Sequence, residues 1–288
     1  MNLLKAASRF SHVSYMRLVF QYIFHRYAPM KITIMGIENF ITFGNLIFLP
    51  LLLKNGFAIL SVKENHLTLS VREDTILTCR TSNGFDIGHL KEIFLDGAYN
   101  AFLSSKNVID VGMSNGDSSI YFAKAGASKV IGIEPTVESF ELAVKNIRDS
   151  KVEGIVIALN KALGNKNGSE DFFMSEYSPN ANSLDQRNMV NLTSRNMYKQ
   201  IVEVVTLENV LDLFNGEPCH LLKMDCEGCE YSVLGNLSNE SYERIEEVWL
   251  EYHNGLQALP DVLTKAGFTL KIRRGTDKMG YILGRKMS

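Results

Sequence analysis

The chain has 288 residues, of which 45% are hydrophobic and 22% charged, a composition that excludes a fibrous protein and a disordered one. Its formal net charge of -2 and its pI near 6.3 provide no overall positive field that would favour a nucleic-acid partner. The four cysteines and the lack of a recognisable secretory signal predict a reduced, cytoplasmic protein.

The first 99 residues are predicted to form a helical and β cap. Residues 3–27 have a helical pattern, and residues 57–60 and 67–71 resemble two strands joined by a turn at 63–65. The apolar stretch 39–53 is shorter than the roughly 18–20 residues that span a bilayer. It therefore predicts a buried helix or cap element and no transmembrane segment, while peripheral membrane contact stays open.

Residues 100–288 are predicted to form the main domain, because strands and helices alternate there as in a parallel sheet covered on both faces. The expected strands are 108–111, 130–133, 155–159, 221–224 and 248–250. Asp117 is expected to cap a helix that runs through Ala125, a second helix follows Thr136, and Thr206 caps a third.

Two further features complete the main domain. The polar stretch 164–200 is rich in Asn and Ser and predicts an insertion with loops. The chain closes with a hairpin of residues 269–272 and 281–283. Because a parallel crossover needs a long connection, the last strand is expected to run antiparallel.

The segment VIDVGMSNGDSS, residues 108–119, predicts a strand, a glycine loop and the start of a helix. Glu134 closes the next strand, where an acidic residue can accept hydrogen bonds from the ribose hydroxyls of an adenosine cofactor. The dinucleotide fingerprint is missing, because Ser114 and Asp117 stand where it needs glycine. An acidic Asp117 also repels a pyrophosphate, whereas a cationic sulfonium tolerates it.

These features favour S-adenosylmethionine as the cofactor. The residues predicted to bind it are Asp110, Gly112, Met113, Ser114, Asn115, Gly116, Asp117, Glu134, Pro135, Ala162 and Asp225.

The segment LLKMDCEGCEYSVL, residues 221–234, places Asp225 and Glu227 at the carboxyl end of a strand, the edge where ligands of such sheets collect. These carboxylates could orient a substrate, accept a proton or bind a hard cation. Glu230 is interpreted as a residue that complements the helix dipole. His253, just after strand 248–250, is a reserve base. Asp225, Glu227 and His253 are therefore the predicted catalytic residues, and no metal site is assigned, although a divalent cation stays open.

The segments VIDVGMSNGD, VIGIEP and KMDCEGCEYSVL together resemble the FkbM-type methyltransferase family, whose members are associated with O-methylation. Weaker matches at 182–184, 206–208 and 248–253 extend the resemblance over roughly residues 90–270. It implies a seven-stranded Rossmann-like class I methyltransferase sheet, mostly parallel with an antiparallel C-terminal strand. It also implies transfer of a methyl group from S-adenosylmethionine to a hydroxyl of a small molecule or glycan. Met113, Ser114, Cys226 and Cys229 depart from the residues usual in the family.

Several alternatives stay open beside this interpretation. The Cys226-x-x-Cys229 pair is compatible with a zinc or redox site, although small core-facing cysteines are favoured. An NAD-type oxidoreductase is disfavoured by the missing glycine, and a non-catalytic adenosyl-ligand-binding protein by the intact Asp225 and Glu227. The sequence specifies neither the acceptor nor the oligomeric state.

Overall fold

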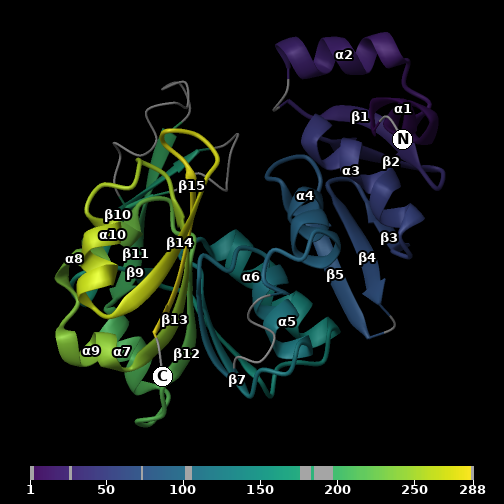
Figure 1. Cartoon of the computed structure of the whole chain (residues 1–288). Coiled ribbons are helices and arrows are strands. Elements are labelled where there is room, and N and C mark those ends of the chain that lie inside the picture. The colour runs from purple at the N-terminus through teal and green to yellow at the C-terminus, as the bar shows by residue number, and fades with distance from the viewer. Residues whose placement is uncertain are drawn as a thin grey trace. The chain divides into compact units, whose positions relative to one another are not determined.

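The computed structural model describes residues 3–25, 28–72, 74–100, 106–175, 183–184 and 197–286. The chain divides into two compact units (Figure 1). The first comprises Met1–Ala101, Lys145–Lys151 and Glu176–Asn180, and the second comprises Phe102–Val144, Val152–Ser175 and Ala181–Ser288.

The first unit combines helices with two small antiparallel sheets. Its helices are α1 (Leu3–Ser11), α2 (Tyr15–Phe24), α3 (Phe43–Lys54), α4 (Asp86–Leu90) and the π-helix η1 (Lys91–Leu95). One sheet pairs β1 (Met30–Ile34) with β2 (Ile37–Ile41), and the other contains, in order, β3 (Ala58–Lys63), β4 (His66–Arg72) and β5 (Thr75–Arg80).

This unit follows most of the expected pattern. The predicted strands 57–60 and 67–71 correspond to β3 and β4, and the apolar stretch 39–53 forms the end of β2 and most of α3. The helical pattern of residues 3–27 is divided between α1 and α2, with residues 26 and 27 outside the described part. Among the described helices, none has both the length and the apolar character needed to cross a bilayer.

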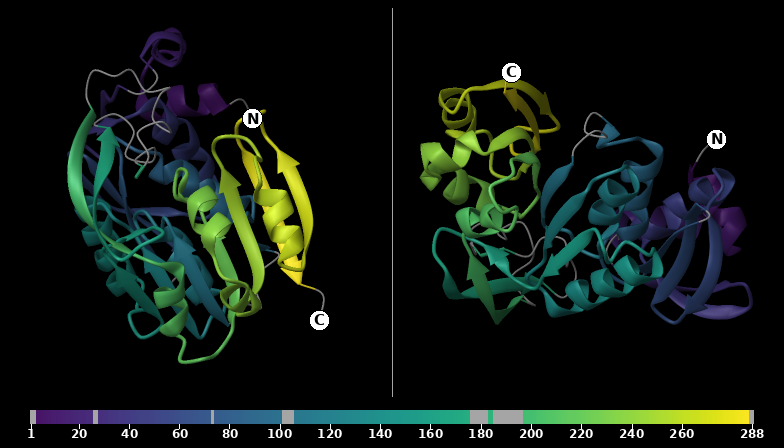
Figure 2. Two further views of the ribbon diagram at one scale, coloured as in Figure 1. Left: turned by 90° about the vertical axis from the view of Figure 1, so that its left-hand side faces the viewer. Right: turned by 90° about the horizontal axis from the view of Figure 1, so that it is seen from below.

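The second unit is built on a seven-stranded sheet, as expected. Its strands are β6 (Asn107–Val111), β7 (Lys129–Ile133), β8 (Val156–Leu159), β12 (Cys219–Met224), β13 (Ile245–Tyr252), β14 (Phe268–Arg274) and β15 (Gly280–Lys286). The order is β14-β15-β13-β12-β6-β7-β8, in which β15 runs antiparallel to both of its neighbours. The yellow C-terminal hairpin forms one edge of this sheet (Figure 2), so the expected antiparallel last strand is confirmed.

Helices cover the sheet on two sides, with α8 and α10 on one side of the strands and α5 on the other (Figure 1). The helices are α5 (Asp117–Lys124), α6 (Val137–Asp149), α7 (Leu207–Asp212), α8 (Cys229–Asn236), α9 (Asn239–Glu243) and α10 (Leu259–Lys265), and the end of α6, from Lys145, belongs to the first unit. Thr206 caps α7 as predicted, since its side chain accepts a hydrogen bond from the backbone N–H of Asn209. The N-cap of α5 is Gly116, so the expectation that Asp117 caps this helix is wrong; Asp117 is its first residue.

The polar stretch 164–200 contains strands, so the expectation of an insertion with loops is wrong for its described residues. Residues 168–175 form β10 (Gly168–Ser175), which pairs antiparallel with β11 (Met197–Val205), and β11 pairs parallel with β9 (Ala162–Leu163). Phe172, Met174, Val202 and Val204 form a small buried cluster on these strands. In β11 the buried Val202 and Val204 alternate with exposed residues, and they pack with Phe172 and Met174 of β10, so a sheet forms despite the polar composition.

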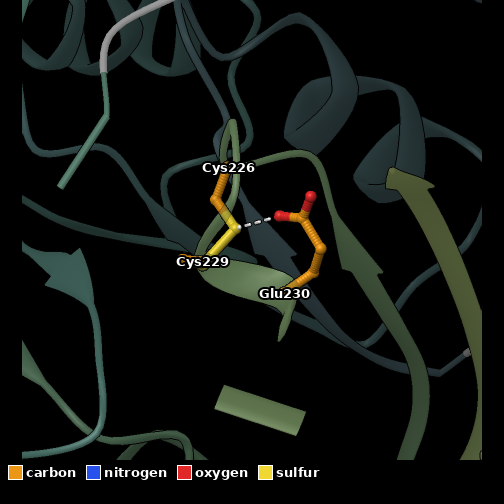
Figure 3. Close-up of side chains that lie close together, drawn as sticks. All are labelled: Cys226, Cys229 and Glu230. Atoms are coloured by element: carbon orange, nitrogen blue, oxygen red, sulfur yellow. Dashed lines mark hydrogen bonds between the residues drawn. A yellow bond between two sulfur atoms is a disulfide. The ribbon is translucent and has the colours of Figure 1, made fainter. Parts of the chain in front are cut away.

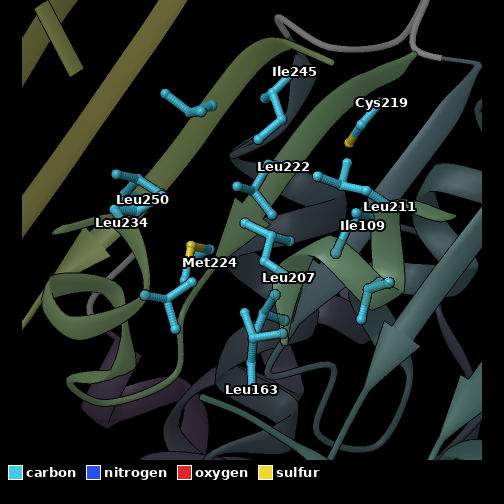
Figure 4. Close-up of a cluster of buried hydrophobic side chains, with 14 of the residues drawn as sticks. Ile109, Leu163, Leu207, Leu211, Cys219, Leu222, Met224, Leu234, Ile245 and Leu250 are labelled. Atoms are coloured by element: carbon cyan, nitrogen blue, oxygen red, sulfur yellow. The ribbon is translucent and has the colours of Figure 1, made fainter. Parts of the chain in front are cut away.

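The main core of the second unit lies between the seven-stranded sheet and helices α7, α8 and α10 (Figure 4). The strands contribute buried aliphatic side chains such as Ile109, Leu222 and Leu250, and α7 contributes Leu207 and Leu211. Burial of each such side chain contributes roughly 1.5–3 kcal/mol. This packing holds the strands whose ends carry the predicted site.

The strand register brings the two sequence motifs to one edge. Strand β6 pairs with β7 on one side and with β12 on the other, and Val111 lies opposite both Ile133 and Met224. The chain runs outward from β6 through β7 and β8 and returns to β12, so the strand order reverses between β6 and β12. Ligands of open α/β sheets bind at such a point, outside the carboxyl ends of the strands.

A buried ion pair joins β6 to β12 just below this edge. Lys223 Nζ lies 2.9 Å from Asp110 Oδ1, and both side chains are almost fully buried. Lys223 Nζ also donates to the backbone oxygen of Gly112 at 2.8 Å, and Asp110 Oδ2 accepts from the hydroxyls of Ser118 and Ser119, each at 2.6 Å. Burial disfavours the charge of Lys223, but the charges of Asp110 and Asp225 outweigh burial and raise its pKa.

We predict that Lys223→Met lowers the free energy of unfolding by about 3–5 kcal/mol, because it leaves the Asp110 carboxylate buried without its cation. The double variant Lys223→Met/Asp110→Asn should recover part of this loss. Urea denaturation measures both, and Lys265→Met, at an exposed lysine of α10, should stay within about 0.5 kcal/mol of the unsubstituted protein. Equal effects of Lys223→Met and Lys265→Met would contradict a structural role for the ion pair.

Candidate active site

The first loop of the site, residues 112–117, turns sharply between β6 and α5. Gly112, Ser114 and Gly116 have φ angles of 75°, 48° and 86°. A Cβ atom on Gly112 would lie 2.0 Å from the backbone oxygen of Asp225, and one on Gly116 would lie 3.2 Å from Ala143. Glycine is therefore required here by the close approach of other parts of the chain as well as by the backbone conformation.

Glu134 follows β7 and faces this loop. Its Oε2 accepts a hydrogen bond from the backbone N–H of Ser114 at 3.2 Å, and its Oε1 accepts from the N–H of Thr136 at 2.9 Å. The carboxylate is largely buried, with 8% of the residue exposed. The hydroxyl of Thr136 also donates to Oε1, at 2.5 Å, so the carboxylate is held in place by residues on both sides of it.

The other residues of the predicted cofactor set lie at different depths. Met113, Asn115 and Asp117 are buried, and Asp117 Oδ1 accepts the N–H of Ser118 at 2.7 Å. Pro135 is half-buried next to Glu134. Ala162 lies in β9 and belongs to the small cluster on the three-stranded sheet. Asp110 forms the ion pair with Lys223, whose ammonium group binds the backbone oxygen of Gly112. Asp110 therefore supports the loop indirectly.

The second loop begins at Asp225, directly after β12. The backbone N–H of Asp225 donates to the oxygen of Val111 at 3.1 Å, so this loop starts beside the first one. Glu227 has a φ of 55°, in the left-handed region, and its backbone oxygen accepts the hydroxyl of Ser183 at 2.7 Å. Two separate chain segments therefore position the predicted catalytic carboxylates.

His253 brings these carboxylates together. Its Nε2 lies 3.6 Å from Asp225 Oδ1, 3.5 Å from Glu227 Oε2 and 3.9 Å from Glu251 Oε1. The side chain of His253 is 7% exposed, whereas that of Asp225 is 33% exposed. The carboxylate of Asp225 is thus the member of this group that solvent or a substrate reaches most easily.

Glu230 orients the His253 ring, a role that the sequence did not predict. Its side chain is fully buried, its Oε1 lies 3.5 Å from His253 Nδ1, and its Oε2 accepts the N–H of Gly228 at 2.9 Å. With Nδ1 directed to Glu230, Nε2 faces Asp225 and Glu227. The helix-dipole interpretation of Glu230 needs no such contact and describes only part of what this residue does.

The charges of this cluster shift two pKa values. Burial disfavours the charged form of His253, but the hydrogen bond to Glu230 and the charges of Glu227 and Asp225 outweigh it and raise the pKa to about 10. Burial raises the pKa of Glu227 to about 8, with His253 opposing and Asp225 reinforcing the shift. At neutral pH the ring of His253 is therefore an imidazolium that binds carboxylates, and it has no free nitrogen to accept a proton.

Cys226 and Cys229 form a disulfide that brackets Glu227 and Gly228 (Figure 3). The expectation of free, core-facing cysteines is wrong for this pair, because the tight turn at Glu227 and Gly228 brings the two sulfur atoms together. Cys226 Sγ also lies 3.3 Å from Glu230 Oε2. A disulfide sulfur carries no proton, so Cys226 can donate to Glu230 only in the reduced state.

Two groups among the described residues have the spacing of metal ligands, and in one of them, Cys226, Cys229 and Glu230, the two sulfur atoms are joined in the disulfide. Asp225, Glu251 and His253 each offer one ligand atom, and these atoms lie within 4.8 Å of one another. A protonated imidazole cannot ligate, so a cation would have to displace the proton of His253. The arrangement is compatible with either an imidazolium or a divalent cation among the carboxylates.

The comparisons with known proteins agree with the geometry. The profile of the Methyltransferase FkbM domain matches residues 110–270, more than half of the chain. Methyltransferase 1 of Beauveria bassiana (strain ARSEF 2860) is 24% identical over 203 residues, which cover 64% of this chain and 81% of that protein.

Two solved structures are similar at low identity. The SAM-dependent methyltransferase of Agrobacterium tumefaciens has a TM-score of 0.43 and 9% identity, with 79% of this chain and 72% of that chain covered. The rRNA methylase of Streptococcus thermophilus has a TM-score of 0.40 and 12% identity, with 66% of this chain and 95% of that chain covered.

We predict that the unfolded protein exposes two reactive thiols before reduction and four after it. Cys79 and Cys219 are buried and lie outside the disulfide, which joins Cys226 and Cys229. Burial raises the pKa of the Cys219 thiol to about 12, so the folded protein should react slowly. Thiol titration with and without a reductant measures this, and four thiols without reduction would contradict the disulfide.

We predict that the ring of His253 titrates near pH 10, well above the ordinary histidine value of about 6.5. Glu230→Gln should lower this midpoint, because it removes a buried negative charge beside Nδ1. NMR of ¹³C-labelled histidine measures the titration, and His253→Gln identifies the signal among the six histidines. A midpoint near 6.5 in the unsubstituted protein would contradict the clustering of carboxylates around the ring.

Proposed function

The chain belongs to the FkbM methyltransferase family and is an S-adenosylmethionine-dependent methyltransferase, and we propose that it methylates a hydroxyl of a small molecule or glycan. The support for a hydroxyl acceptor is the group of carboxylates beside the glycine loop. An alcohol must lose its proton as the new O–C bond forms, so a proton acceptor is needed within hydrogen-bond reach.

The residues of the first loop and Glu134 would hold the cofactor. S-Adenosylmethionine supplies a methyl group activated by its sulfonium charge. Gly112 and Gly116 give the tight turn between β6 and α5, and the Glu134 carboxylate, held at the end of β7 by Ser114 and Thr136, would accept the ribose hydroxyls. Carboxylates also favour a cationic sulfonium nearby, whereas they would repel the pyrophosphate of a dinucleotide. The residues present therefore fit this cofactor.

The observation that carries the proposal is the contact between the two motifs. Asp225 lies directly against Gly112, because the backbone oxygen of Asp225 fills the space that a side chain would need. The backbone of the residue that carries this carboxylate is thus in contact with the glycine loop, on the edge where the strand order reverses. Holding donor and acceptor in reactive geometry accounts for much of the rate in such a transfer.

In this proposal Asp225 binds the acceptor hydroxyl and takes its proton. His253, as an imidazolium, keeps Asp225 and Glu227 in place through Nε2, and Glu230 fixes the ring through Nδ1. Glu227, with its pKa raised to about 8, is the second group able to exchange a proton near neutral pH. In this proposal His253 is therefore a positioning residue, and not the reserve base that the sequence predicts.

A divalent cation at Asp225, Glu251 and His253 is the second candidate for activating the hydroxyl, and it rests on the ligand spacing of these residues. A cation would lower the pKa of a bound hydroxyl. Direct proton transfer to Asp225 predicts that activity persists in EDTA. Activity that is lost in EDTA and restored by magnesium would favour the cation.

We predict that Glu134→Ala weakens the binding of S-adenosylmethionine by at least about 100-fold. The change removes an acceptor for two charge-assisted hydrogen bonds, each worth roughly 1.5–3 kcal/mol. Isothermal titration calorimetry measures the affinity, with Glu138→Ala, an exposed residue in the first turn of α6, as the matched control. A change within twofold, or tight binding of NAD instead, would count against the proposed cofactor site.

We predict that Asp225→Asn lowers turnover at least about 100-fold, the lower end of what a general base contributes, while cofactor affinity is largely retained. The substitution keeps the shape of the side chain and removes its charge. Transfer of labelled methyl groups to a panel of hydroxylated acceptors measures turnover, with Asp212→Asn on the exposed side of α7 as the control. Nearly intact activity in Asp225→Asn would mean that another residue is the base.

A further inference from the structure

Helix α2 in the first unit carries a stripe of exposed apolar side chains. Met16 is 74% exposed, Phe20 53%, Ile23 60% and Phe24 64%. These positions follow the spacing of one helix face. The buried residue of α2 is Leu18, which lies about half a turn away from the centre of this stripe. The helix therefore packs through Leu18 and turns its larger apolar side chains to solvent.

Exposed apolar residues on this scale require an explanation. Single exposed hydrophobic residues are common on soluble proteins, whereas a contiguous group on one helix face marks a site of interaction. Two aromatic members of the stripe also contact one another, since the rings of Phe20 and Phe24 are 4.8 Å apart. The exposed surface is thus a defined face of α2, which we call the α2 face: Met16, Phe20, Ile23 and Phe24.

The charged side chains of the sequence segment that contains α2 have one sign. Residues 1–37 contain five lysine and arginine residues and no aspartate or glutamate, although the whole chain has a net charge of -2. The basic residues are Lys5, Arg9, Arg17, Arg26 and Lys31, of which Lys31 is ion-paired with Glu38, just after this segment, at 2.5 Å. Lys5, Arg9 and Arg17, on α1 and α2, are exposed. An apolar face and a local positive charge therefore occur in the same short segment.

We propose that the α2 face binds the surface of a bilayer that contains anionic phospholipids, with α2 lying in the interface. Apolar and aromatic side chains enter the boundary between headgroups and acyl chains, and nearby lysine and arginine residues contact the anionic headgroups. A protein partner or a second copy of the chain would also cover apolar residues. The concentration of positive charge in a chain that is acidic overall favours a strongly anionic surface.

This binding is expected to be reversible, because a single short helix buries little apolar area. It would hold the methyltransferase at a membrane without a transmembrane segment. The proposal is independent of the proposed acceptor, since none of the residues of the α2 face belongs to the candidate active site.

Vesicle flotation tests the proposal with the full chain. The protein should float with vesicles of phosphatidylcholine and phosphatidylserine and remain largely unbound with phosphatidylcholine alone. Increasing salt should weaken the binding, because it screens the attraction between the basic residues and the headgroups. Failure to bind the anionic vesicles at low salt would overturn the proposal, and so would equal binding to both kinds of vesicle.

Two variants separate the apolar from the electrostatic contribution. Phe20→Ser/Ile23→Ser should weaken vesicle binding at least about tenfold, because two apolar side chains no longer leave water. Arg9→Glu/Arg17→Glu should abolish the preference for anionic vesicles. Ile201→Ser, at a residue of β11 that is 74% exposed, is the matched control and should bind like the unsubstituted protein.

Folding and self-association are measured alongside. Each variant should bind S-adenosylmethionine with unchanged affinity, which shows that the second unit is intact. If Phe20→Ser/Ile23→Ser binds vesicles as well as the Ile201→Ser control does, the α2 face is not the anchor. If the unsubstituted protein is a dimer that this double change converts to a monomer, and vesicles are not bound, the face belongs to a second copy and the proposal is wrong.

Discussion

The buried ion pair between Lys223 and Asp110 is the constraint on which the site depends. A buried charge is tolerated only with a well-placed partner, and Lys223 has its partner on the neighbouring strand, 2.9 Å away. The same ammonium group binds the backbone oxygen of Gly112, at the start of the glycine loop. One side chain of the second motif thus fixes the backbone of the first, so the two motifs form a single edge.

Above this pair, negative charge accumulates around His253. Glu230 occupies one ring nitrogen, and Asp225, Glu227 and Glu251 surround the other. Repulsion among these carboxylates costs free energy. The positive charge of the His253 imidazolium offsets part of this cost. A site with excess negative charge attracts a cationic ligand, and the sulfonium of the family's cofactor is one. The electrostatics and the proposed chemistry therefore agree.

Much of this arrangement could be predicted from sequence, because buried parallel strands are short apolar runs and ligand-binding residues follow them. Asp225 and Glu134 were found in this way, and the structure places both at strand ends. The contact of Glu230 with His253 is not predictable in this way, because the two residues are 23 positions apart, on α8 and just after β13, and only the packing of these elements brings them together. The Cys226–Cys229 disulfide was also missed, because its formation depends on the backbone turn at Glu227.

The central claim is that the cofactor binds where the glycine loop meets Asp225. Amide hydrogen exchange with and without S-adenosylmethionine locates the binding site directly. The account predicts slower exchange in peptides that cover residues 112–117 and 225–229, no change in β10 and β11, and no effect of NAD. Cofactor binding that leaves both loops unprotected, or that protects a different part of the chain instead, would contradict it.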